Sequence, residues 1–207
     1  DPNSAVASDG RWALCVGDGL GGQVLLVDGA LHLASGDVLS PSNGITFGGE
    51  VRMHLARGGE VFLVHPTGTT PGTATLPPSY GLFRGGELVL ESRVGATLTP
   101  SPFAAPVAIE GLTLHAVNEG GRMLAGLLLV EAGTVARHHA LAIVDSTPGG
   151  QLVGVSLVGW TGDPWMPGAG LALDTLFGAP KIDATGRVAW HARGAGVDHV
   201  FVDGLTV

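Results

Sequence analysis

Cysteine, lysine and aromatic residues are scarce in this 207-residue chain. The one cysteine, Cys15, allows no disulfide within the chain, and its place in an apolar segment predicts a buried thiol. Lys181 is the one lysine and the net charge is −8, so the sequence offers no basic patch for nucleic acid. Apolar runs such as Leu124–Val130 fall far short of the roughly 20 residues of a membrane-spanning helix. The sequence therefore predicts neither nucleic-acid binding nor a transmembrane segment.

Glycine and proline are abundant instead, with 35 and 13 residues, and hydrophobic residues make up 45% of the chain. This composition is typical of short apolar strands joined by many tight turns. No segment of helical length combines the apolar spacing of a helix with capping residues. We therefore expect an all-β protein.

One turn-and-strand phrase, in which a glycine and an arginine precede an alternating apolar segment, recurs along the chain. Its copies are Ser8–Leu14, Ala56–Leu63, Asn118–Ala125 and Asp183–Trp190. A period of about 50 to 65 residues indicates that one supersecondary unit has been copied and stacks on its neighbours. Aligned on the phrase, the units cover residues 7–55, 56–117, 118–182 and 183–207.

Each unit also contains a hairpin signal, because a glycine-centred pair such as Asp28-Gly29, Gly85-Gly86 or Asp203-Gly204 separates two apolar strands. A loop rich in glycine and proline follows, and then a strand that leads into the next phrase. Four strands in up-and-down order form the blade of a β-propeller. The sequence thus predicts a single propeller domain over residues 1–207, with four blades.

The two ends of the chain suggest how the ring closes. The fourth unit stops after its third predicted strand, and the segment Ala5, Val6 and Ala7 stands where the other units carry their last strand. We expect this segment to complete the last blade, beside the strand with Val200 and Val202 and near Val207. In the alternative, the open position accepts the N-terminal strand of another molecule, which gives a filament or a ring of subunits.

The fourth unit carries a resemblance to a known family. Its phrase Asp183–Trp190 follows a Gly-Asp-x-x-x-Pro-Gly segment at residues 162–168, and together they resemble the tandem Asn-x-x-Gly-x-x-Ala-Phe repeats of secreted bacterial proteins. The second unit departs from the pattern at Arg57. The resemblance implies propeller blades, an exported and surface-associated protein, and no catalytic residues to carry over. Since the chain begins at Asp1 without methionine, we expect an extracellular or cell-surface protein whose signal peptide has been removed.

Metal binding finds little support in the sequence. Among eight histidines only His138 and His139 are close together, and neighbours on a strand point to opposite faces. Calcium fits better, because aspartates lie in glycine-rich turns, although none matches an Asp-x-Asp-x-Asp-Gly loop. These aspartates are Asp18, Asp28, Asp37, Asp163 and Asp183. We expect no cofactor and no metal site, with Ca²⁺ as the ion that these turns would favour.

A loop with two tryptophans provides the best candidate for a binding surface. Trp160, Asp163 and Trp165 lie together in a segment rich in proline and glycine, where they would form a platform for a glycan or a protein partner. The alternative is that the two rings pack over the core. No nucleophile elbow is present. We therefore expect a non-enzymatic structural or binding module, with a filament subunit and a glycan hydrolase of paired carboxylates as the alternatives.

Overall fold

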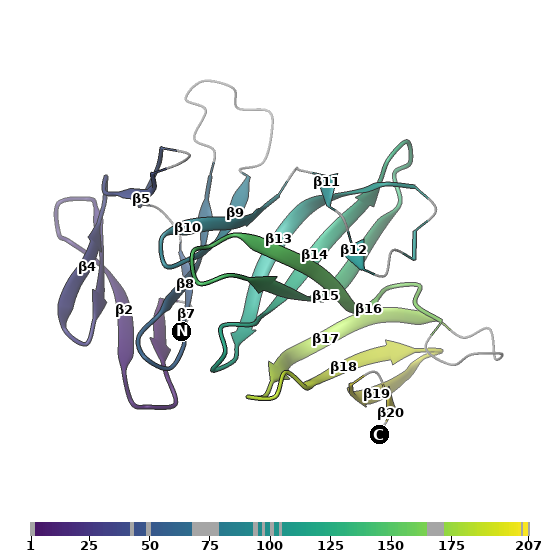
Figure 1. The fold of residues 1–207 in the computed structure, drawn as a ribbon. Coiled ribbons are helices and arrows are strands. Elements are labelled where there is room, and N and C mark those ends of the chain that lie inside the picture. The colour runs from purple at the N-terminus through teal and green to yellow at the C-terminus, as the bar shows by residue number, and fades with distance from the viewer. Residues whose placement is uncertain are drawn as a thin grey trace. The chain divides into compact units, whose positions relative to one another are not determined.

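The computed structural model describes residues 3–41, 44–48, 51–67, 79–92, 95–96, 98–99, 102–103, 105–164, 172–203 and 205–206. All regular elements in these ranges are β-strands (Figure 1), so the predicted all-β class is confirmed. In the same ranges, no helix has the length and apolar composition needed to cross a bilayer.

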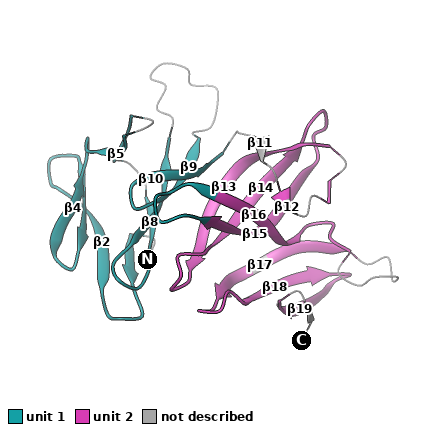
Figure 2. Cartoon of the chain, in the orientation of Figure 1, with its two compact units in different colours: residues 1–92, 146–152 teal, residues 93–145, 153–207 magenta. Residues whose placement is uncertain are grey.

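The chain divides into two compact units (Figure 2). The first unit comprises residues 1–92 together with 146–152, and the second comprises residues 93–145 and 153–207. Each unit contains two large sheets, and each large sheet includes four consecutive antiparallel strands that neighbour one another in chain order.

The first unit holds two four-stranded antiparallel sheets and a short ribbon. The first sheet contains β1 (Ser4–Val6), β2 (Trp12–Gly17), β3 (Gln23–Val27) and β4 (Ala30–Ala34). The ribbon contains β5 (Val38–Ser40) and β6 (Ile45–Thr46). The second sheet contains β7 (Arg52–Leu55), β8 (Val61–Pro66), β9 (Tyr80–Arg84) and β10 (Glu87–Glu91).

The second unit contains most of the remaining strands. The third sheet has the order β11 (Gly95–Ala96), β13 (Val107–Val117), β14 (Met123–Glu131), β15 (Arg137–Ser146), β16 (Leu152–Trp160) and β12 (Leu98–Thr99). In it β12 runs parallel to β16. The fourth sheet contains β17 (Leu173–Ile182), β18 (Val188–Gly194), β19 (Val197–Val202) and β20 (Leu205–Thr206).

The repeated phrase contains the turns from β1 to β2, β7 to β8, β13 to β14 and β17 to β18. At each turn one N–H group donates to the carbonyl four residues later, at 2.9 to 3.0 Å. The donors are Ala7, which directly precedes the first copy, and Ala56, Asn118 and Asp183. Because this turn reverses the chain tightly, the strand before the phrase pairs with the strand after it. The strand before each phrase therefore belongs to the same sheet as the strand after it, and not to the preceding unit as the sequence predicted.

This offset corrects the predicted closure of the last sheet. The fourth sheet already has four strands, all from residues 173–206, so the prediction that it lacks its last strand is wrong. The N-terminal strand β1 pairs instead with β2, with Ala5 opposite Ala13. Val6 is exposed and Ala7 is buried. The C-terminal candidates Val200 and Val202 lie in β19, between β18 and β20, while Val207 lies outside the described residues.

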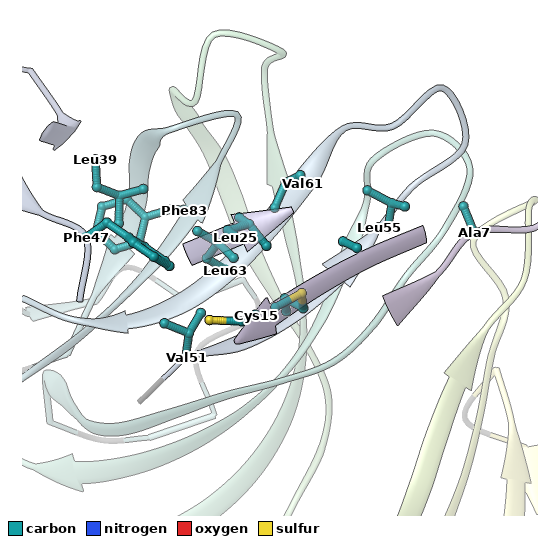
Figure 3. Close-up of a cluster of buried hydrophobic side chains, with 12 residues drawn as sticks. Ala7, Cys15, Leu25, Leu39, Phe47, Val51, Leu55, Val61, Leu63 and Phe83 are labelled. Atoms are coloured by element: carbon teal, nitrogen blue, oxygen red, sulfur yellow. The ribbon is translucent and has the colours of Figure 1, made fainter. Parts of the chain in front are cut away.

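The core of the first unit is built from alternating residues of facing strands (Figure 3). Alternation places every second side chain on one face of a strand, and these faces carry the apolar residues. The buried members are Ala7, Ala13, Cys15, Leu25, Leu39, Phe47, Val51, Met53, Leu55, Val61, Leu63 and Phe83. Cys15 is thus part of the core, as its apolar surroundings in the sequence predicted.

The core of the second unit centres on Trp190 of β18. Its ring stacks on Phe201 with a centroid distance of 4.3 Å. Gly159 of β16 lies so close to the indole that a Cβ atom at this position would collide with it. Glycine is therefore required at residue 159 to let the ring pack, and the tight contact fixes the position of the strand end that leads to Trp160.

Candidate functional site

The predicted platform lies at the end of β16, where the chain turns toward β17. Trp160 is the last residue of β16 and is partly exposed. The N–H of Asp163 donates to the carbonyl of Trp160 at 3.0 Å, and the N–H of Leu173 donates to the carbonyl of Asp163 at 3.0 Å. This turn holds Trp160 and Asp163 close together. Trp165 lies outside the described residues.

Two further rings complete this surface, and the sequence analysis placed neither of them beside the tryptophans. The ring of Phe103 lies 4.8 Å from the ring of His138 and 6.2 Å from that of Trp160, measured between centroids. All three side chains are partly exposed. We call Phe103, Glu131, His138, Trp160 and Asp163 the aromatic platform.

Hydrogen bonds from two sides fix His138. Its Nε2 lies 2.9 Å from Oε1 of Glu131, at the end of β14, and its Nδ1 lies 3.1 Å from the carbonyl oxygen of Thr161. A carbonyl only accepts hydrogen bonds, so the contact with Thr161 is a hydrogen bond in the tautomer that carries a proton on Nδ1. The two contacts on opposite sides of the ring fix its orientation.

Asp163 differs from the other turn aspartates in its environment. Burial raises the pKa of its carboxyl group, since a desolvated carboxylate is less stable than a hydrated one. The other aspartates considered as calcium ligands are held by their own turns. Asp18 accepts from the N–H groups of Leu20 and Gly22, and Asp37 accepts from that of Ala34.

Asp28 and Asp183 are likewise engaged, the first by Arg11 and the second by the N–H groups of Thr185 and Arg187. Within the ranges that the structure describes, no three His, Cys, Asp or Glu residues gather as a metal site requires. These carboxylates therefore serve turn formation in the described part of the chain.

An ion pair recurs in all four large sheets. It joins the residue at the end of the turn to a residue at or within one position of the end of the second strand after the turn. The pairs are Arg11–Asp28 at 2.6 Å, Glu60–Arg84 at 2.8 Å, Arg122–Asp145 at 2.7 Å and Arg187–Asp203 at 2.7 Å. The second pair has its charges exchanged. We call this pair, together with its turn, the repeat clamp.

The clamp of one sheet also holds the turn of the next sheet in the same unit. In the first unit, Arg11 Nη1 donates to the carbonyl of Gly58 at 2.6 Å, and Asp9 Oδ2 accepts from the N–H of Gly58 at 2.9 Å. The guanidinium group of Arg11 covers Gly59, where an added Cβ atom would lie 2.5 Å from it. Arginine thus packs on a surface that only glycine leaves open.

The second unit repeats this arrangement between its two sheets. The side chain of Asn118 donates from Nδ2 to the carbonyl of Asp183 at 3.2 Å. Arg122 covers Gly186, where an added Cβ atom would lie 2.7 Å from Nη1. Arg11 and Arg122 thus each reach the turn of the neighbouring sheet within their own unit.

The clamps shift the acidity of their exposed carboxylates. The pKa of Asp9 is lowered chiefly by the hydrogen bond from Gly58, and that of Asp28 by the N–H of Trp12 and then by Arg11. Arg187 is the main cause of the lowered pKa of Asp203. All of these interactions stabilise the ionised form, so the carboxylates are charged at neutral pH.

The thiol of Cys15 is not activated, because burial raises its pKa. No family model matches the sequence, and no curated protein matches it.

Proposed function

We propose that this protein is an exported, non-enzymatic β-propeller module that binds an extracellular or cell-surface partner through the aromatic platform. The observation that carries the proposal is the grouping of Phe103 and Trp160 around His138, whose ring is held by Glu131 and Thr161. Aromatic faces bind apolar surfaces, and neighbouring polar groups give direction to the contact.

A glycan is the ligand class that fits this surface best. A sugar ring has an apolar face that can lie on an aromatic ring and hydroxyl groups at its edge that can bond to carboxylates. Glu131, at the end of β14, supplies a carboxyl group beside the His138 ring, and Asp163 follows closely on the end of β16. Glu131 and Thr161 hold the His138 ring in one orientation, and a ring that is already oriented favours binding because less conformational entropy is lost.

The propeller arrangement is part of the proposal and has support within each unit. In the first unit β1 lies beside β7, and in the second unit β13 lies beside β17. These are the first strands of consecutive sheets, and innermost strands of consecutive blades are neighbours in a propeller. Export rests on the resemblance to repeats of secreted bacterial proteins.

A glycan array followed by titration calorimetry tests the proposed function. We expect Phe103→Leu and Trp160→Ala each to weaken binding of the best array ligand about tenfold or more, a loss of about 1.4 kcal/mol. Trp12→Ala is the matched control, because Trp12 is an exposed tryptophan in the other unit and its substitution should leave affinity unchanged. Equal affinity in all three variants, or an array without any ligand, would contradict the proposal.

A further inference from the structure

The ring of His138 lies between two hydrogen-bond acceptors. Its Nε2 is 2.9 Å from Oε1 of Glu131, and its Nδ1 is 3.1 Å from the carbonyl oxygen of Thr161. A carbonyl oxygen and an ionised carboxylate both accept hydrogen bonds and donate none. A neutral imidazole carries one N–H group, so it makes one of these two bonds, whereas an imidazolium ion makes both.

The two side chains of this pair are shielded from water. Only 22% of the His138 side chain and 19% of the Glu131 side chain are exposed. Partial burial strengthens the attraction between an imidazolium ion and a carboxylate, because less water screens the charges. Both residues belong to the second unit, as do Phe103 and Trp160. The arrangement therefore exists within one compact unit of the chain.

The other titratable groups on the surrounding elements do not share this contact. Arg137 and His139 are the neighbours of the ring on β15, and alternation along the strand turns them to the opposite face. Arg137 pairs with Glu110 of β13 at 2.9 Å. Asp163 follows β16, and burial raises the pKa of its carboxyl group. Because Asp163 also titrates above its ordinary range, its effect has to be separated by a variant of its own.

We propose that the Glu131–His138 pair makes ligand binding at the aromatic platform dependent on pH, with the protonated ring as the binding form. This inference rests on the proposed function. Two hydrogen bonds hold the ring 4.8 Å from that of Phe103, which lies 6.2 Å from that of Trp160. When the ring loses a proton as the pH rises, one bond is lost and the ring is held from one side alone. A ligand then has to order the ring again, so it binds more weakly.

Nuclear magnetic resonance of the ligand-free chain tests the first step. The nitrogen chemical shifts of the His138 ring report its protons between about pH 5 and pH 8, where histidine ordinarily changes its charge. Nuclear Overhauser effects between the His138 and Phe103 rings report their contact. We expect two protonated nitrogens at the acidic end and a weaker ring contact once a proton is lost. A contact that stays the same after the ring has lost its proton would overturn the proposal.

Titration calorimetry with the best ligand of the glycan array tests the second step. Between about pH 5 and pH 8 we expect the affinity of the wild type to fall about two- to tenfold. Glu131→Gln should remove this fall, because an amide both donates and accepts and so bonds to the ring in either protonation state. Two controls should keep the fall, whatever their absolute affinity: His139→Gln, at the exposed neighbouring histidine, and Asp163→Asn.

The outcomes separate this inference from the proposed function. Equal affinity of the wild type at both pH values would overturn the pH dependence and leave the platform as a binding site. A fall that persists in Glu131→Gln, or that disappears in Asp163→Asn, would likewise overturn it. Absence of any ligand at either pH would overturn the proposed function itself, and the regulation with it.

Discussion

Arg84 donates two hydrogen bonds to Glu60, from Nε at 2.8 Å and from Nη2 at 3.0 Å, and stands where the other three sheets carry an aspartate. The second repeat thus keeps the ion pair of the clamp with the charges exchanged. The exchange brings a guanidinium group to the end of β9, from where Arg84 Nη1 donates to the carbonyl of Ser146 at 2.8 Å. A carboxylate in this place could not donate that bond.

The exchanged pair should be the most costly of the four clamps to break. Only 7% of the Arg84 side chain is exposed, against 63% for Arg187. Removing the partner of a buried charge leaves that charge uncompensated, so we expect Glu60→Gln to lower the free energy of unfolding by about 2 to 4 kcal/mol. Asp203→Asn, at the exposed pair, is the matched control and should cost less. Urea unfolding checks the order, and a larger loss for Asp203→Asn would contradict it.

Asn118 should matter more than its neighbours in the turn. Its Oδ1 accepts from the N–H groups of Gly120 and Arg122, and its Nδ2 reaches the next turn. Asn118→Ala leaves these groups without their partners, and we expect a loss of about 1 to 3 kcal/mol in urea unfolding. Glu119→Ala, on the exposed side of the same turn, should stay within about 0.5 kcal/mol. Equal losses of unfolding free energy in Asn118→Ala and Glu119→Ala would contradict the stabilising role assigned to the hydrogen bonds of the Asn118 side chain.

These two predictions also show where sequence reasoning succeeded and where it could not. The all-β class, the glycine turns and the fourfold phrase follow from local composition and turn chemistry, which the sequence displays directly. The first strand of each repeat does not follow from the sequence, because a periodic pattern looks the same whichever element is taken as its first. The second clamp was also hard to predict because its charges are exchanged between Glu60 and Arg84. In the sequence, the arginine of the second copy of the phrase is Arg57, which does not form the ion pair of the clamp.

The aromatic platform was predicted only in part, for a similar reason. Trp160 and Asp163 are close in sequence and were found through composition. Phe103 and His138 approach Trp160 only after β13 to β16 have formed, and a single sequence contains no signal for that long-range contact. An alignment of the four repeats would not have found it either, because the contact occurs in one sheet.

The buried His65 should make the first unit sensitive to mild acid. Its ring is desolvated between Phe47 and Phe83, and burial lowers its pKa below the ordinary value of 6.5. The unfolded chain therefore binds a proton first as the pH falls. The stability that neutral His65 contributes is fully present above pH 6.5 and is lost as the pH falls through the folded-state pKa.

Urea midpoints measured between neutral and mildly acidic pH check this sign. In His65→Gln the side chain does not titrate and still offers an acceptor to the N–H of Gly48, which His65 Nε2 binds at 3.0 Å. We expect the variant to lose the acid-dependent decrease in this window. An unchanged pH dependence in His65→Gln would assign the decrease to other groups.

Cys15 should react slowly with thiol reagents in the folded protein. The side chain is buried in the core of the first unit, and its raised pKa lowers the fraction of reactive thiolate. With Ellman's reagent at neutral pH we expect a rate about tenfold or more below that of the urea-unfolded chain. Equal rates in the two states would mean that β2 does not pack as described.

The central claim is that the strand before each turn phrase pairs with the strand after it. Cross-strand nuclear Overhauser effects in the isotope-labelled protein test it most directly. We predict contacts of Ser4–Val6 with Trp12–Leu14, and of Leu205–Thr206 with Phe201–Val202, as the strand registers require. Contacts of Ser4–Val6 with β19, in place of those with β2, would contradict the account.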